Sequence, residues 1–316
     1  MVQRLVASRL SVTVAAESLK KAENSSGVPM PRIAYVNGRY VAHADASVHI
    51  EDRGYQFADG VYEVCEVSRG FIVDMPRHLA RLNRSLTELS IAWPVTPIVL
   101  PLILREVVNR NHVANGLVYV QVTRGVASRD FVFPSADTRP SLVVTARKAD
   151  PAASAKRAET GIAVITVPEN RWDRVDIKSV GLLPNVLAKQ KAKEAGAQEA
   201  WFVDTDGNVK EGGSSNAWIV TRDGVLVTRP AEHGILRGIT RTTMFEVAAT
   251  LGLKIEERGF SVAEAKAARE AFISSATTIA MPVVAIDGEP IANGHPGSIT
   301  LSLRQAFFDI AEKSPA

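Results

Sequence analysis

The apolar positions of the chain fall into short runs that are separated by turn dipeptides. In "IAYVNGRYV" two such runs flank Asn37-Gly38, and Asp206-Gly207, Asp223-Gly224 and Asp287-Gly288 separate further pairs of runs. An Asn-Gly or Asp-Gly dipeptide between apolar-rich runs favours a β-hairpin, because both residues tolerate the positive φ of a tight turn. The pattern therefore predicts abundant antiparallel sheet.

Longer apolar runs at 116–125, 141–148 and 161–167 predict strands that are buried on both faces. In other segments apolar residues recur every three or four positions, which predicts amphipathic helices. These segments are 75–89, 97–110, 182–195, 240–251, 262–271 and 299–312. Because strands and helices do not alternate strictly, the sequence predicts an α+β fold of antiparallel-rich sheets with flanking helices.

The length and a change of composition predict two domains. A chain of 316 residues is long for a single core. Residues 149–160, "ADPAASAKRAET", are polar and rich in Ala, Pro and Ser, so we predict a linker between a smaller α/β domain at 30–148 and a larger domain at 161–316. Residues 1–29 lack the sustained apolar core of a signal peptide and are predicted to be a flexible N-terminal extension.

Composition excludes several functions. The net charge of +3 is too small to indicate a nucleic-acid surface. Cys65 is the single cysteine, which excludes an internal disulfide and predicts a reducing compartment such as the cytoplasm. No apolar run reaches the ~20 residues that span a bilayer. The phosphate-binding, zinc-hydrolase and serine-hydrolase motifs are missing, and the six histidines are not spaced as metal ligands.

Lys178 stands in an apolar segment, "VDIKSVGLLPN", which spans 175–185. Most lysines keep their ammonium group in solvent, and that interpretation remains open from the sequence. The alternative is an amine that is partly removed from water. Such a setting favours the neutral amine, which is a nucleophile for a carbonyl group.

Other polar residues stand at predicted turns. Glu211 follows a hairpin strand directly, and His78 and Arg81 lie one helical turn apart. Residues 238–240 open a predicted helix, where free backbone N–H groups bind anions, and 273–278 form a hydroxyl-rich turn. Alone, the arginine and the glutamate would each be expected in solvent. Together with the lysine they supply what a phosphorylated aldehyde cofactor requires.

Five motifs now indicate a family. They are "EDRGYQFADGVYEV" at 51–64, "VYVQVTRGVASR" at 118–129, "DIKSVGLLPNVLAKQKA" at 176–192, "EGGSSNAW" at 211–218 and "LRGITR" at 236–241. In this order they closely resemble the D-amino acid aminotransferases, within the fold type IV group of pyridoxal 5'-phosphate (PLP) enzymes. The resemblance covers about 33–312. It implies a two-domain fold type IV enzyme that moves the amino group of a D-amino acid to pyruvate or 2-oxoglutarate by a ping-pong mechanism.

The resemblance also implies roles for individual residues. Lys178 resembles the lysine that holds PLP as a Schiff base and then moves a proton. Glu211 resembles the carboxylate that pairs with the pyridine nitrogen of PLP. Arg81, Ile239 and Thr240 resemble the residues that bind its phosphate.

Two further positions complete the expected cofactor site. Leu236 resembles the aliphatic residue that packs on the ring of PLP. In the second phosphate-binding turn Ala276 stands where the family pattern has threonine. We expect the backbone N–H of Ala276, with Ser275, to serve the phosphate instead.

The substrate site departs from the family pattern. Tyr62 and Arg129 resemble residues that bind the substrate α-carboxylate, with Arg129 reaching across from the partner in a homodimer with shared active sites. Phe131 stands where the family has histidine, and it cannot donate a hydrogen bond to a carboxylate. Val64 shares a strand face with Tyr62 and is expected to line the side-chain pocket.

The loss of the histidine keeps related activities open. These are a branched-chain L-amino acid aminotransferase, an (R)-amine transaminase, and an enzyme like aminodeoxychorismate lyase. A non-catalytic relative that only binds is disfavoured, because both Lys178 and Glu211 are present. The expected partners are a small amino donor and a 2-oxo acid, without nucleic acid, membrane or metal.

Overall fold

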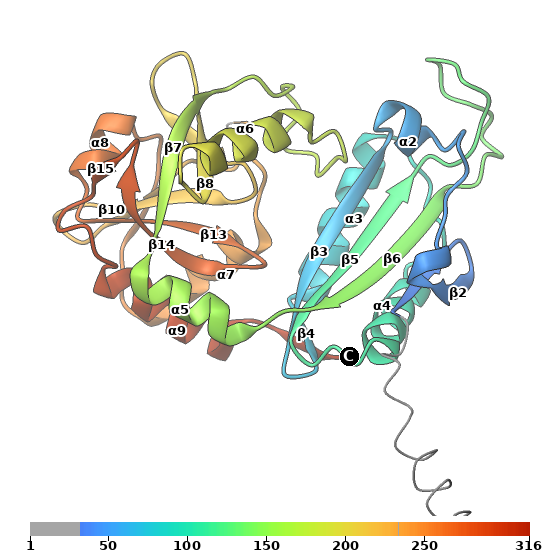
Figure 1. Ribbon diagram of the computed structural model, residues 1–316, viewed down its shortest axis with the longest axis horizontal. Coiled ribbons are helices and arrows are strands. Elements are labelled where there is room, and N and C mark those ends of the chain that lie inside the picture. The colour runs from blue at the N-terminus through green and yellow to red at the C-terminus, as the bar shows by residue number, and fades with distance from the viewer. Residues whose placement is uncertain (1–31, 233) are drawn as a thin grey trace, which may run out of the picture.

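The computed structural model describes residues 32–232 and 234–316, so the extension predicted at 1–29 lies outside the described residues. The strands form two sheets, each in its own lobe, and helices pack against both (Figure 1). This mixture of helices and antiparallel-rich sheets confirms the α+β prediction. No helix in the described ranges is long and apolar enough to cross a membrane.

The first lobe contains a seven-stranded sheet in the order β16-β4-β3-β5-β6-β1-β2, in which every neighbouring pair is antiparallel. The strands are β1 (Ile33–Val36), β2 (Arg39–Ala42), β3 (Gly60–Ser68), β4 (Phe71–Val73), β5 (Gly116–Thr123), β6 (Ser141–Lys148) and β16 (Lys313–Pro315). The helices are η1 (His43–Asp45), α2 (Arg53–Phe57), α3 (Met75–Glu88) and α4 (Val99–Arg110). Helices α3 and α4 pack on one face of the sheet and enclose the first core.

The second lobe contains a nine-stranded sheet in the order β12-β11-β10-β13-β14-β7-β8-β9, with β15 beside β14. It consists of β7 (Ile162–Pro168), β8 (Glu199–Val203), β9 (Val209–Gly212), β10 (Asn216–Val220), β11 (Leu226–Thr228), β12 (Ile255–Glu257), β13 (Glu270–Ser275), β14 (Ile279–Ile286) and β15 (Glu289–Pro290). Its helices are α5 (Pro151–Thr160), α6 (Leu183–Glu194), α7 (Ile239–Thr250), α8 (Val262–Ala267) and α9 (Ser298–Ile310).

The hairpin and helix predictions are confirmed. The four turn dipeptides join β1 to β2, β8 to β9, β10 to β11 and β14 to β15, and all four pairs are antiparallel. Asn37 and Asp287 both adopt positive φ, as a tight hairpin turn requires. Each predicted helix is present, although α8 ends at Ala267, four residues earlier than expected.

The prediction that 116–125 and 141–148 are buried on both faces is wrong. Along β5 the buried Val118 and Val120 alternate with the half-buried Tyr119 and Gln121, and β6 alternates in the same way. The cause is the layering, because α3 and α4 cover only one face of this sheet.

The connection between the two lobes also contains regular structure. Most of the predicted linker folds as α5, because the side chain of Asp150 caps the helix by accepting from Ala152 N and Pro151 suits its first turn. In addition, β16 returns from the end of the chain to pair with β4. The domain limits at 30–148 and 161–316 therefore stay a prediction.

One acidic side chain on β3 has an unusual environment. Glu66 lies four residues after Tyr62 and therefore on the same face of the strand. Burial raises the pKa of Glu66 from 4.5 to about 8, and Arg304 of α9 offsets this only in part.

Glu66 is expected to make the protein less stable as the pH rises. The pKa of Glu66 is higher in the folded protein than in the unfolded chain. Its contribution to the free energy of unfolding is therefore complete below pH 4.5 and is lost as the pH rises through about 8. We therefore expect Glu66→Gln to reduce the fall in melting temperature between about pH 6 and about pH 9. Thermal unfolding of both proteins across this range checks the prediction, and parallel curves would contradict it.

Candidate active site

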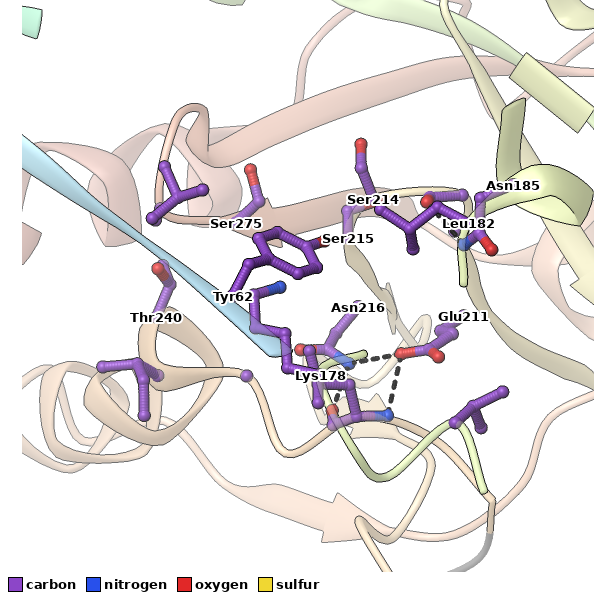
Figure 2. Close-up of a pocket in the computed structure, with 18 of the residues that line it drawn as sticks. Tyr62, Lys178, Leu182, Asn185, Glu211, Ser214, Ser215, Asn216, Thr240 and Ser275 are labelled. Carbon is purple, nitrogen blue, oxygen red and sulfur yellow. Dashed lines mark hydrogen bonds between the residues drawn. The ribbon is translucent and has the colours of Figure 1, made fainter. Parts of the chain in front are cut away.

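A pocket between the lobes collects most of the residues that the sequence singles out. It is lined by Tyr62, Val64, Arg81, Lys178, Glu211, Leu236, Ile239, Thr240, Ser275 and Ala276. Figure 2 shows Lys178 beneath Tyr62, with Thr240 to one side and Glu211 to the other. Arg129 and Phe131 are not among the residues that line it.

The loop that carries Lys178 is fastened to β3. The Lys178 carbonyl oxygen accepts a hydrogen bond from Tyr62 N at 3.0 Å, and Val180 N donates to the Gly60 carbonyl oxygen at 3.0 Å. Ile177 adds an apolar anchor, because it is buried in the core of the first lobe. The side chain of Lys178 therefore enters the pocket, where its Nζ lies 4.3 Å from the centroid of the Tyr62 ring.

Glu211 is the penultimate residue of β9 and lines the pocket, and only 4% of its surface is exposed. Its Oε1 accepts from Arg171 Nη1 at 2.6 Å, and its Oε2 accepts from Asn216 Nδ2 and Leu236 N, each at 3.1 Å. Burial raises the pKa of Glu211, although the guanidinium of Arg171 and the amine of Lys178 lower it. The carboxylate is thus oriented by donors and disposed to share a proton.

Arg171 is itself held in place. It donates to both carboxylate oxygens of Glu169, at 2.9 and 2.6 Å, and its guanidinium lies 4.2 Å from the centroid of the Phe202 ring. The resulting charge pairs offset the desolvation of Glu211 only in part, because its pKa remains raised.

Arg81 is fixed by a buried ion network at the wall of the pocket. Its Nε and Nη2 donate to the two oxygens of Glu63 at 2.7 and 2.8 Å, and its Nη1 donates to the Arg237 carbonyl oxygen at 2.9 Å. The guanidinium and His78 hold the pKa of Glu63 well below its usual range, against the effect of burial. The ionised Glu63 accepts from His78 Nδ1 at 2.7 Å, and burial lowers the pKa of this histidine.

Backbone donors face the pocket beside Arg81. Helix α7 begins after Gly238, and no side chain caps its first turn, so the N–H groups of Ile239 and Thr240 remain available to an anion. A Cβ on Gly238 would lie 2.0 Å from Asn216 Oδ1, so only glycine fits at this close approach. Across the pocket, Ser275 Oγ pairs with Thr278 Oγ1 at 2.8 Å in the turn after β13.

This set of donors fits PLP. An arginine, a helix N-terminus and a hydroxyl-rich turn suit a phosphate group, and a buried carboxylate suits the pyridine nitrogen. The amine of Lys178 faces the same space and suits the aldehyde carbon. Among residues 32–232 and 234–316 no three His, Cys, Asp or Glu side chains are grouped to hold a metal ion.

Arg129 and Phe131 lie outside the pocket of their own chain. The guanidinium of Arg129 stacks over the Phe57 ring, 4.7 Å from its centroid. Phe131 contacts the same ring with a centroid distance of 5.6 Å, and 84% of its surface is exposed.

Several residues of the site were missed by the sequence analysis. Asn216 and Asn185 stand inside quoted motifs, which was a usable signal for both, and Asn185 Nδ2 holds the Gly213 carbonyl oxygen at 2.9 Å. Glu63 also stands inside the quoted motif at 51–64. Arg171 lies in none of the quoted motifs and had no such signal, because its partner Glu211 is distant in sequence.

Comparisons with known proteins indicate the family of this chain. The family described as "Amino-transferase class IV" matches residues 60–286. A D-alanine aminotransferase of Bacillus licheniformis is 40% identical over 271 residues, which are 86% of this chain and 94% of that protein. One from Staphylococcus epidermidis is 38% identical over 273 residues, covering 86% of this chain and 95% of that protein.

Solved structures share the fold. The branched-chain amino acid aminotransferase of Escherichia coli superposes with a TM-score of 0.81 and 24% identity, covering 89% of this chain and 94% of that one. A PLP-bound hypothetical aminotransferase from Mycobacterium tuberculosis gives a TM-score of 0.76 and 24% identity, over 87% and 98% of the two chains. The chain therefore belongs to the class IV aminotransferases, a family of PLP-dependent enzymes.

Proposed function

We propose that this enzyme transfers the amino group of a D-amino acid to a 2-oxo acid in two ping-pong half-reactions, with PLP held as a Schiff base on Lys178. The observation that carries the proposal is the single pocket in which Lys178 stands with Glu211 and Arg81. The D-alanine aminotransferases, at 36–40% identity over most of the chain, support the choice of D-amino acids. The likeness to branched-chain enzymes rests on 24–25% identity and supports only the fold.

Each residue of the pocket has a distinct task in this proposal. Bound PLP supplies an electron sink that makes the substrate Cα–H acidic. Lys178 would hold the aldehyde carbon of PLP and would carry the proton that leaves Cα. Glu211 holds a proton at the ring nitrogen, and its raised pKa suits this sharing.

The remaining contacts position the cofactor and the substrate. Arg81 and the N–H groups of Ile239 and Thr240 would bind the phosphate at one wall. Ser275 and the backbone of Ala276 bind it from the opposite turn. Leu236 packs on the ring, while Tyr62 and Val64 face the substrate.

We further propose a homodimer with shared active sites. Arg129 stacks on Phe57 outside its own pocket, so it binds a substrate carboxylate only in a second copy of the chain. Two exposed apolar surfaces would be covered by such a contact. They are Phe131, Val132 and Phe133 in the β5–β6 connection and Leu183, Val186 and Leu187 on α6.

Phe131 is proposed to weaken the hold on the α-carboxylate, because its ring cannot donate a hydrogen bond. The alternatives with other substrates therefore remain to be tested against D-amino acids. A cytoplasmic location stays a prediction from the single cysteine.

Arg81→Lys is expected to weaken PLP binding. A lysine preserves the charge beside Glu63 but lacks the planar fork that serves both Glu63 and a phosphate. We expect the dissociation constant for PLP to rise about 10- to 100-fold. Titration of the apoprotein with PLP by fluorescence gives this constant.

Arg84→Lys is the matched control, because Arg84 lies one turn further along α3 and contacts Asp176, which is half-buried and does not line the pocket. It should bind PLP as the unchanged protein does. If both variants bind alike, Arg81 has no special role in holding the phosphate.

A screen of the first half-reaction tests the substrate. The PLP-loaded enzyme is mixed with D-alanine, L-alanine, D-glutamate, L-leucine or an (R)-arylalkylamine in the absence of a 2-oxo acid, and the loss of the visible PLP absorption is followed. We expect D-alanine to react and L-alanine, which differs only in hand, to remain unreacted. Rapid conversion of L-leucine with D-alanine untouched would overturn the proposed substrate.

A further inference from the structure

The connection between β5 and β6 contains residues 124–140, and its residues 126–140 form an arm on the surface of the first lobe. It projects past α2 on the side away from the second lobe (Figure 1). The arm contains no helix or strand, and residues 128–133 are all exposed. A long loop without regular structure in a compact protein usually has a function.

The base of the arm is narrow. Gly125 adopts a φ of +100°, and a Cβ at this position would lie 2.0 Å from the Arg139 carbonyl oxygen. The two ends of the arm thus meet at a point where only glycine fits. Arg53 N also donates to the Gly125 carbonyl oxygen at 2.9 Å, which ties this end to α2.

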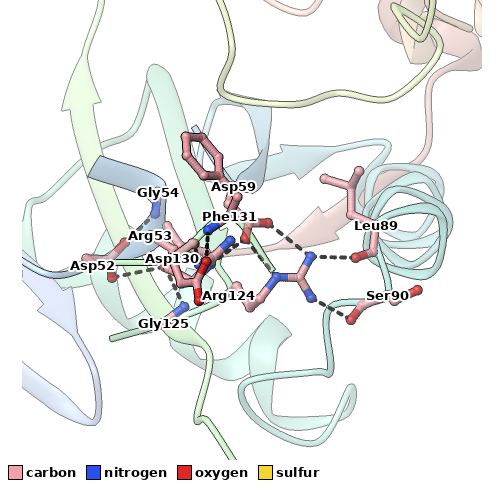
Figure 3. A network of polar contacts seen from close by, with 11 residues as sticks. Asp52, Arg53, Gly54, Asp59, Leu89, Ser90, Arg124, Gly125, Asp130 and Phe131 are labelled. Atoms are coloured by element: carbon pink, nitrogen blue, oxygen red, sulfur yellow. Dashed lines mark hydrogen bonds and ion pairs between the residues drawn. The ribbon is translucent and has the colours of Figure 1, made fainter. Parts of the chain in front are cut away.

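Two arginines beneath the arm hold its exposed part. Arg53 Nη1 donates to the Asp130 carbonyl oxygen at 2.7 Å (Figure 3). The guanidinium of Arg124 lies 3.7 Å from the centroid of the Phe133 ring, within cation–π range. The two contacts involve residues that precede and follow Phe131 in the sequence. Together they fix the position of the arm, including Arg129.

One carboxylate orients both arginines. Asp59 Oδ2 accepts from Arg53 Nε at 2.8 Å and from Arg124 Nε at 2.7 Å, and its Oδ1 accepts from Arg124 Nη2 at 3.0 Å. The side chains of Asp59, Arg53 and Arg124 are only 11%, 4% and 9% exposed. Arg124 also donates to the carbonyl oxygens of Leu89 and Ser90, which joins the network to the end of α3.

We propose that Asp59 is a positioning residue for substrate binding. It sets the orientation of Arg53 and Arg124, these hold the arm, and the arm presents Arg129 and Phe131 to the pocket of a second copy. The inference rests on the proposed function, because it requires Arg129 to act in that second pocket. Without the Asp59 carboxylate the two guanidinium groups lose their shared partner and repel each other.

The test combines substrate kinetics with proteolysis of the arm. Asp59→Asn retains the size of the side chain and removes its charge. We expect the KM for D-alanine to rise at least about tenfold with a smaller change in kcat, because a small displacement of a binding group is costly. Trypsin should also cut faster after Arg129, a bond in the arm that mass spectrometry identifies, since the Arg139-Pro140 bond resists trypsin.

Two further variants separate positioning from general damage. Asp52→Asn removes another buried carboxylate nearby, which caps α2 through Gly54 N and binds Thr123 Oγ1 but no arginine, so it should match the unchanged protein. Asp59→Glu restores the charge and should fall between the unchanged protein and Asp59→Asn. Equal cleavage rates in the two asparagine variants, or a looser arm with an unchanged KM, would overturn the inference.

Arg129→Leu distinguishes failure of the inference from failure of the proposed function. An unchanged KM in this variant would refute the role of the arm in the second pocket. The cleavage rates of Asp59→Asn and Asp52→Asn would still decide whether Asp59 anchors the arm.

Discussion

The backbone hydrogen bonds between β3 and the loop that carries Lys178 are the constraint on which the site depends. They join a strand of the first sheet to a segment that follows the first strand of the second sheet. Ile177 strengthens this attachment of the loop to the first lobe, because its side chain is buried in the core of that lobe. The position of the amine relative to Glu211 is therefore set by the packing of two lobes. A displacement of either lobe would separate the groups that the proposed function requires to act on one molecule.

The two buried carboxylates of the pocket region, Glu63 and Glu211, have pKa values that are shifted in opposite directions. Glu63 is ionised, since Arg81 and His78 lower its pKa despite burial, and it fixes the guanidinium that faces the pocket. Glu211 has an arginine partner as well, yet burial prevails and its pKa is raised. In the proposed function, the first carboxylate would serve as a permanent negative charge and the second as a proton partner. Their different surroundings, and not their chemistry, assign these roles.

The sequence could predict what depends on local residues. The turn dipeptides located the hairpins and helical periodicity located the helices. The resemblance to a family singled out Lys178, Glu211 and Arg81, which line one pocket. It could not predict the partners that orient those residues, because Glu63 lies 18 positions from Arg81 and Arg171 lies 40 positions from Glu211. The exposed face of β5 and the return of β16 were missed for the same reason, since both depend on which elements pack together. The resemblance to a family predicted a role for Arg129, but the contacts that anchor the arm carrying it are visible only in three dimensions.

Covalent trapping at Lys178 tests the central claim most directly. The protein is loaded with PLP, reduced with borohydride, digested with trypsin and analysed by mass spectrometry. The account predicts one pyridoxyl phosphate group on the peptide that spans 175–189, attached to Lys178, where the modified side chain also blocks cleavage. Attachment to another lysine, such as Lys189, or the absence of any reduced adduct, would contradict it.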